Sequence, residues 1–179
     1  MRIKYYITKI NFIFGLLTFT LAGILILRVT QAKYNLGIWL IIAAVYIWFL
    51  LVSKSRTKEF SPSLYNPFGY IELHVFNKSN HDINSFLGMC SINILKAKNL
   101  KKNVVFCTWH FKRKSLEHVF GNAITIIKPS FFELAIGKID MWYYKKKSKN
   151  PYIKAIIDTN LLSGKTLKYI NSKANVLGG

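Results

Sequence analysis

The chain has 179 residues, and its 26 lysines and arginines outnumber 7 acidic residues to give a formal net charge of +19. Hydrophobic residues nevertheless make up 51% of the chain. This excludes an intrinsically disordered protein, because disordered chains combine high charge with low apolar content. With 10 Gly, 4 Pro and 2 Cys, the composition also excludes collagen-like chains and disulfide-rich scaffolds.

Two uncharged apolar runs occupy the N-terminal part of the chain, at residues 10–27 and 36–52. At about 1.5 Å per residue, each helix would be roughly 25–27 Å long, close to the thickness of about 30 Å of a bilayer hydrocarbon core. The residues between them are few enough for a tight connection. The pattern therefore predicts a transmembrane helical hairpin within residues 1–53.

Basic residues lie mainly at the outer ends of this predicted hairpin. Their distribution predicts its orientation in the membrane. Under the positive-inside rule the more basic side faces the cytoplasm. The outer flanks hold six cations (Arg2, Lys4, Lys9, Lys54, Arg56 and Lys58), and the connection holds two (Arg28 and Lys33). A cleavable signal peptide is the alternative for the first run, but that run is longer than a usual signal core and no Ala-x-Ala site follows. We therefore expect a multi-pass protein of the bacterial inner (plasma) membrane, with both termini cytoplasmic.

The composition changes after the second apolar run. Residues 54–67 place Ser, Pro and Asn between charges and are predicted to be a linker. Residues 54–179 hold 21 of the 26 cations and all seven acids, a net charge of +14 (21 − 7). The sequence thus predicts a basic cytoplasmic domain over residues 68–179.

Short apolar segments separated by turn residues run through the first half of this domain. Ile71–Phe76 alternates apolar and polar residues and is predicted to be a strand. Asn84–Leu95 fits a helix or a strand. Asn103–Phe111 and Asn122–Ile127 are rich in β-branched and aromatic residues and are predicted to be strands.

In the second half, Pro129 suits a first helical turn and Gly137 a helix stop, so a short helix is predicted between them. Ile139–Tyr144 and Tyr152–Ile157 are predicted to pair as a hairpin around a basic turn, and Thr166–Ala174 to form a last helix. The predicted fold class is a membrane-anchored α+β protein. It has a two-helix transmembrane hairpin followed by a small mixed α+β cytoplasmic domain with a mainly antiparallel sheet.

Cysteine and histidine residues offer one set of candidate catalytic groups. A membrane-tethered thiol- or metal-dependent enzyme would use Cys107, His110 and His118, with Cys90 as a further thiol. Its orienting acid would be one of three carboxylates (Glu117, Asp140 or Asp158). Only the Cys107/His110 spacing fits a zinc site, and a cysteine in an aromatic strand is more often a core residue. We therefore expect no metal, no cofactor and no catalysis, and keep the enzyme as an alternative.

The segment Ser163–Thr166 reads Ser-Gly-Lys-Thr and is similar to the end of a phosphate-binding loop. The motif requires a second glycine five positions before Gly164, and that position is Thr159. The segment is therefore predicted to be a turn.

Clusters of lysines are the main candidate binding residues. They follow the predicted strands and fill the predicted hairpin turn (Lys112, Arg113, Lys114, Lys145, Lys146, Lys147 and Lys149). A surface of one sign attracts partners of the opposite charge. We expect a non-catalytic binding module for an acidic protein partner or an anionic membrane surface, in contact with membrane lipid, for example in an immunity or membrane-complex accessory role.

A membrane-anchored nucleic-acid binder is the second alternative. It is disfavoured because the cations are nearly all lysine, whereas bidentate phosphate recognition favours arginine. The aromatic residues that could stack on bases also lie in predicted strands. No motif assigns the chain to a family.

Overall fold

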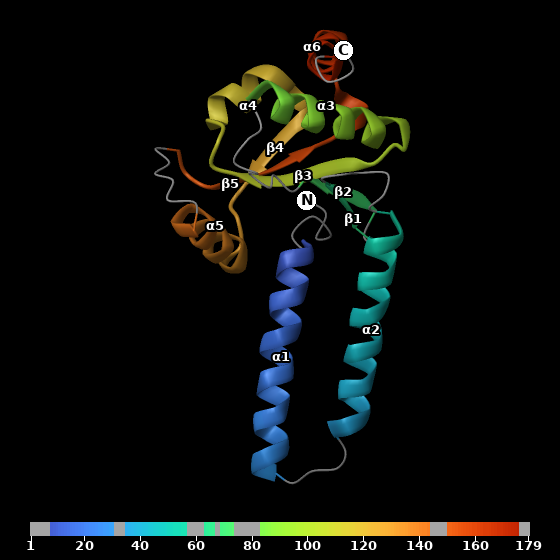
Figure 1. Ribbon diagram of the computed structural model, residues 1–179, viewed down its shortest axis with the longest axis vertical. Coiled ribbons are helices and arrows are strands. Elements are labelled where there is room, and N and C mark those ends of the chain that lie inside the picture. Colours follow the sequence, from blue (N-terminus) through green and yellow to red (C-terminus); the bar gives the residue numbers. More distant parts are fainter. Residues whose placement is uncertain are drawn as a thin grey trace.

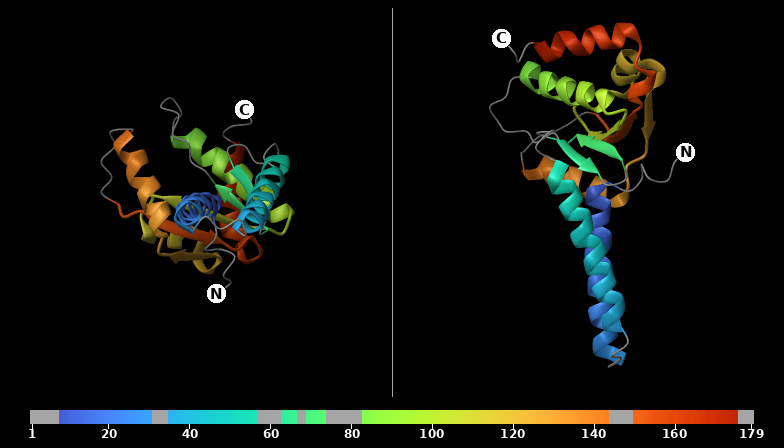
Figure 2. Two further views of the ribbon diagram at one scale, coloured as in Figure 1. Left: turned by 90° about the horizontal axis from the view of Figure 1, so that it is seen from below. Right: turned by 90° about the vertical axis from the view of Figure 1, so that its right-hand side faces the viewer.

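The computed structural model describes residues 8–30, 35–56, 63–66, 69–73, 83–143 and 150–175. Two long helices, α1 (Lys9–Thr30) and α2 (Asn35–Arg56), run side by side and project from a compact α+β domain (Figures 1 and 2). In that domain a twisted sheet has a layer of helices on one face and helix α5 (Phe131–Tyr143) on the other (Figure 1).

The sheet has five strands in the order β1-β2-β3-β5-β4. They are β1 (Ser63–Asn66), β2 (Tyr70–Leu73), β3 (Asn103–Thr108), β4 (Ile124–Ile127) and β5 (Ile153–Ile157). Strands β2 and β3 are parallel, whereas the other neighbours are antiparallel. The sheet is therefore mixed, and β5 lies between β3 and β4.

The main core lies between one sheet face and helices α3 (Ile83–Asn99), α4 (Arg113–Phe120) and α6 (Gly164–Asn175), which we call the three-helix layer. Alternate residues of the strands point to this face, as the two-residue period of a strand requires. Examples are Ile71, Val104 and Ile157, which are all fully buried. Apolar burial at this face is the main stabilising contribution.

The opposite sheet face is covered by α5 (Phe131–Tyr143) and by the start of α1, which contacts α5. The rings of Phe14 and Phe132 stack at this contact with their centroids 5.3 Å apart. The second apolar cluster on this face is small and contains Tyr70, Val105 and Ile156. Polar and charged residues occupy much of the remaining buried space there.

The predicted transmembrane hairpin requires correction. Within the described residues, none of the helices combines the length and the hydropathy of a membrane-spanning segment. The predicted fold class, the transmembrane and inner-membrane assignments and the multi-pass localisation are therefore not supported.

The two helices nevertheless pack against each other through aromatic rings. Phe12 stacks on Tyr46, and Phe19 lies against Trp39 with ring centroids 5.4 Å apart. Gly23 lies against the Trp39 ring, so close that an added Cβ would collide with it. Several large apolar side chains of both helices are exposed, among them Phe19, Leu25 and Trp48.

The predicted hairpin of residues 139–144 and 152–157 is also wrong. Residues 139–143 continue helix α5, and β5 pairs with β3 and β4 instead. Gly137 does not end the helix: it is buried, and a Cβ there would lie 2.8 Å from Cζ of Tyr152. The glycine permits this close approach of helix and ring, a role that helical propensity does not reveal.

Other element predictions are confirmed with small shifts in their ends. Strands lie at β2, β3, β4 and β5, a helix begins at Phe131, and the last helix is α6. The ambiguous segment 84–95 is helical, within α3. Strand β1 lies inside the predicted linker 54–67 and has no counterpart among the predicted elements.

Candidate functional site

The structure separates the predicted catalytic residues. Cys107 lies directly opposite Lys154 in the β3–β5 register and points to the α5 face of the sheet. His118 is exposed on α4, in the three-helix layer that covers the other face. His110 follows β3 and is exposed beside the Trp109 ring. No three His, Cys, Asp or Glu side chains within the described ranges are grouped to hold a metal ion.

Both thiols are held in their neutral form. Burial raises the pKa of the Cys90 thiol to about 12. Burial is also the main cause that raises the pKa of Cys107, and the negative charge of Glu133 adds to it. A nucleophilic cysteine requires the opposite shift, because the thiolate is the reactive form. This environment suits structural cysteines.

Lys112, Arg113 and Lys114 lie at the start of α4 and are exposed. Arg113 donates a hydrogen bond of 2.7 Å to Glu117 one turn later, whereas the two lysines have no ion pair in the part of the chain that the structure describes. Lys145, Lys146, Lys147 and Lys149 lie outside the described residues. Of the predicted basic binding residues, the structure therefore describes only those at the start of α4.

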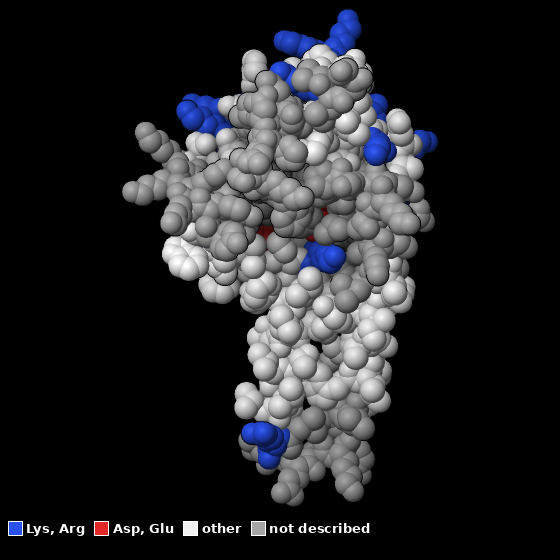
Figure 3. All heavy atoms as spheres, viewed as in Figure 1, with Lys and Arg blue, Asp and Glu red and all other residues white. Residues whose placement is uncertain are grey.

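The three-helix layer carries more cations than the α4 cluster alone. Its helices, with Lys112 before α4, contain eight basic residues (Lys96, Lys98, Lys112, Arg113, Lys114, Lys165, Lys168 and Lys173) and one acid, Glu117. In Figure 3, blue side chains lie at the top and upper flanks of the domain and also at the base of the domain and the foot of the long helices, while red atoms show only in small recesses. The layer therefore presents a surface of nearly one sign.

The described acids do little to offset this charge at the surface. Glu72 and Glu133 are 2% and 1% exposed. Glu117 is paired with Arg113, and the Asp158 carboxylate accepts a hydrogen bond from the backbone N–H of Asn160. The two buried carboxylates are used inside the protein, Glu133 together with the buried cation Lys154.

Glu133 is the centre of a buried polar network between α1, α5 and the sheet. Its Oε1 accepts hydrogen bonds of 2.8 Å from the Lys154 ammonium and from the Thr8 hydroxyl. Its Oε2 accepts one of 2.7 Å from the backbone N–H of Ser130. Both partners of the Glu133–Lys154 ion pair are 1% exposed. A buried charge pair with these additional donors is the arrangement that offsets the cost of desolvation.

Glu72 holds the first turn of α1. Its carboxylate accepts a hydrogen bond of 2.8 Å from the backbone N–H of Lys9, and Thr8 accepts one of 3.3 Å from Asn11 N–H as the N-terminal cap. A negative charge at a helix N-terminus is favourable because the helix dipole is positive there. The Tyr70 hydroxyl also bonds to Glu72, and burial together with that carboxylate raises the pKa of Tyr70.

Sequence reasoning missed this network. Its signal was a single charged residue inside each of two apolar strands, Glu72 in Tyr-Ile-Glu-Leu and Lys154 in Ile-Lys-Ala-Ile-Ile. A charge at a strand position that is buried on both sides requires a partner. Glu133, predicted only as part of a short helix, is that partner for Lys154.

Ser163–Thr166 caps helix α6. Ser163 Oγ accepts a hydrogen bond of 3.1 Å from Thr166 N–H, and the Thr166 hydroxyl donates to the Val119 carbonyl. The first of these is an N-cap interaction, and the second joins α6 to α4. The prediction that the segment is a turn is wrong for Gly164–Thr166, because these residues begin helix α6.

Comparisons with protein-family models, with curated proteins and with solved structures find no match to this chain.

Proposed function

We propose that the α+β domain is a non-catalytic binding module that docks an acidic protein partner on the three-helix layer. The observation that carries the proposal is the distribution of charge. Eight basic residues and one paired acid lie on this layer, while Glu72 and Glu133 are consumed by internal contacts. Such a surface accelerates encounter with an acidic partner and disfavours basic ones.

Two further features support binding in preference to catalysis. Burial raises the pKa of both thiols, so neither Cys90 nor Cys107 is a ready nucleophile. The candidate histidines are exposed and lie on different elements from these thiols. Seven of the eight basic residues are lysines, which favours a charged protein surface over bidentate recognition of nucleic-acid phosphates.

A matched pair of charge reversals tests this proposal. Lys112→Glu with Lys114→Glu changes the three-helix layer, and Lys128→Glu with Lys138→Glu makes the same change in charge at exposed sites outside it. Binding of the full chain to a labelled oligoglutamate peptide is measured by fluorescence anisotropy. We expect the first variant to bind about tenfold more weakly and the second to change by less than about threefold, since contributions of exposed charges fall off with distance.

Three outcomes would contradict the proposal. Equal losses for the two variants would mean that net charge, and no particular face, attracts the peptide. Tighter binding to single-stranded DNA, with a steep salt dependence, would favour the nucleic-acid alternative. Tighter binding to phosphatidylserine vesicles would favour an anionic lipid surface.

A further inference from the structure

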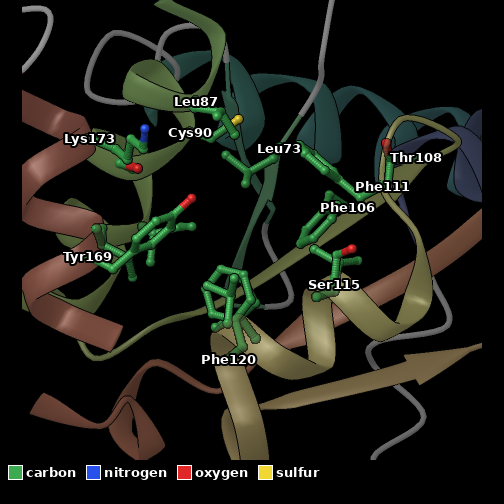
Figure 4. Close-up of a pocket in the computed structure, with 16 residues that line it drawn as sticks. Leu73, Leu87, Cys90, Phe106, Thr108, Phe111, Ser115, Phe120, Tyr169 and Lys173 are labelled. Atoms are coloured by element: carbon green, nitrogen blue, oxygen red, sulfur yellow. The ribbon is translucent and has the colours of Figure 1, made fainter. Parts of the chain in front are cut away.

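A cavity of about 180 Å³ opens between the three-helix layer and the sheet. Figure 4 shows Phe106 of β3 and Phe120 of α4 on one side, with Tyr169 and Lys173 of α6 on the other. Leu73, Leu87 and Ile94 add to a wall that is predominantly apolar. The cavity interior therefore favours a hydrocarbon group.

The polar groups of the wall indicate the charge of the occupant. Among the described residues that line the cavity, Lys173 carries a charge and none is acidic. Its Nζ lies 5.9 Å from the centroid of the Tyr169 ring, and the residue is partly buried. Among these described lining residues, the ammonium therefore has no carboxylate beside it.

The size of the cavity limits the occupant. An apolar protein cavity of about 150 Å³ holds one benzene molecule, and this cavity is of about 180 Å³. With roughly 30 Å³ for each methylene, about the liquid volume of a water molecule, it accepts a chain of about six carbons. A long fatty acid exceeds this volume.

We propose that this cavity is a binding site for a short-chain monocarboxylate, whose alkyl chain lies among Phe106, Phe120 and Tyr169 and whose carboxylate pairs with Lys173. The cation and the apolar wall match the two ends of such a molecule. The site lies beneath the three-helix layer and uses Lys173, whereas docking of an acidic protein is tested at Lys112 and Lys114. Failure of one proposal therefore leaves the other standing.

A series of straight-chain carboxylates from butyrate to octanoate tests the site by calorimetric titration of the full chain. We expect affinity to rise about fourfold for each added methylene, the factor that burial of one methylene contributes. The rise stops at about six carbons, where the cavity is full. Hexanol and hexylammonium, which have the same chain without the negative charge, bind more weakly than hexanoate.

Two variants on α6 isolate the carboxylate contact. Lys173→Met retains the length of the side chain and removes its charge, and we expect about tenfold weaker binding of hexanoate with unchanged binding of hexanol. Lys168→Met is the matched control, because Lys168 is exposed on the same helix and does not line the cavity. Leu87→Phe narrows the cavity and weakens both ligands, which shows where they bind.

Unchanged binding of hexanol by Lys173→Met would also show that this variant is folded. Equal binding of hexanoate, hexanol and hexylammonium would overturn the assignment of a carboxylate. Equal effects of Lys173→Met and Lys168→Met would overturn the role of Lys173. Absence of binding by every member of the series would overturn the site itself.

Discussion

Lys154→Met is expected to destabilise the protein by about 3–5 kcal/mol, the usual cost of leaving one charge of a buried pair without its partner. Lys154 and Glu133 are both 1% exposed and lie 2.8 Å apart. Removing the ammonium leaves the carboxylate with the neutral donors of Thr8, Asn11 and Ser130. The free energy of unfolding from urea titration, monitored by circular dichroism, measures the loss.

An exposed ion pair in the same chain provides the control. Arg113 and Glu117 are 64% and 45% exposed at the side chain and lie one helical turn apart. Glu117→Gln should cost about 0.5 kcal/mol or less, because solvent screens such pairs. The double variant Lys154→Met with Glu133→Leu should recover much of the stability lost by Lys154→Met alone. Equal costs for Lys154→Met and Glu117→Gln would show that the buried pair does not form.

The protein is expected to lose stability steeply above pH 9, because buried acidic groups keep their protons in the folded state. The pKa of Cys90 is raised from 9.0 to about 12, and those of Cys107 and Tyr70 are raised as well. Above the unfolded-state pKa the unfolded chain binds fewer protons than the folded one, so the free energy of unfolding falls as pH rises. Each such group lowers the free energy of unfolding by up to about 1.4 kcal/mol for each pH unit of increase.

Cys90→Ala separates this effect from the titration of lysines. The variant lacks one raised group, so its stability should fall less steeply with pH, by about 1.4 kcal/mol per pH unit, between pH 9 and 12. The lysines are common to both proteins and cancel in the difference. The measurement is urea unfolding at a series of pH values with a reducing agent. Superimposable pH profiles of the two proteins would contradict the raised pKa of Cys90.

The polar network also attaches the start of α1 to α5 and the sheet. Thr8 and Glu133 are 125 residues apart in the chain and share a buried hydrogen bond. Glu72 of β2 adds a second contact to the same helical turn. The start of α1 therefore belongs to the α+β domain, although its apolar sequence pattern indicates a separate unit.

Several elements could be predicted because their signals are local. The β-branched and aromatic residues of β3 and the apolar run of β5 mark strands whichever neighbours they have. The apolar runs 10–27 and 36–52 lie in two helices for the same kind of reason. The basic residues of the segments that form α3, α4 and α6 are likewise visible in the sequence.

Other features depend on partners that are distant in sequence. Residues 139–143 have strand-like composition, yet they are helical, and α5 packs closely on Tyr152 at Gly137. The parallel pairing of β2 with β3 and the central position of β5 arise from the whole sheet. The small cavity beside Lys173 exists only where three helices meet the sheet.

The sequence by itself determined the net charge, the positions of most strands and helices, and the basic residues that begin α4. Only the tertiary structure decided that Glu72 and Glu133 are buried and that Lys154 forms an ion pair with Glu133. It also decided that the candidate cysteines and histidines lie on different elements. The physical reason is that sequence periodicity shows which face of a helix or strand is buried. The hydrogen bonds and ion pairs of a buried side chain depend on residues that are distant in the sequence. The proposed binding surface depends on which basic residues α3, α4 and α6 carry.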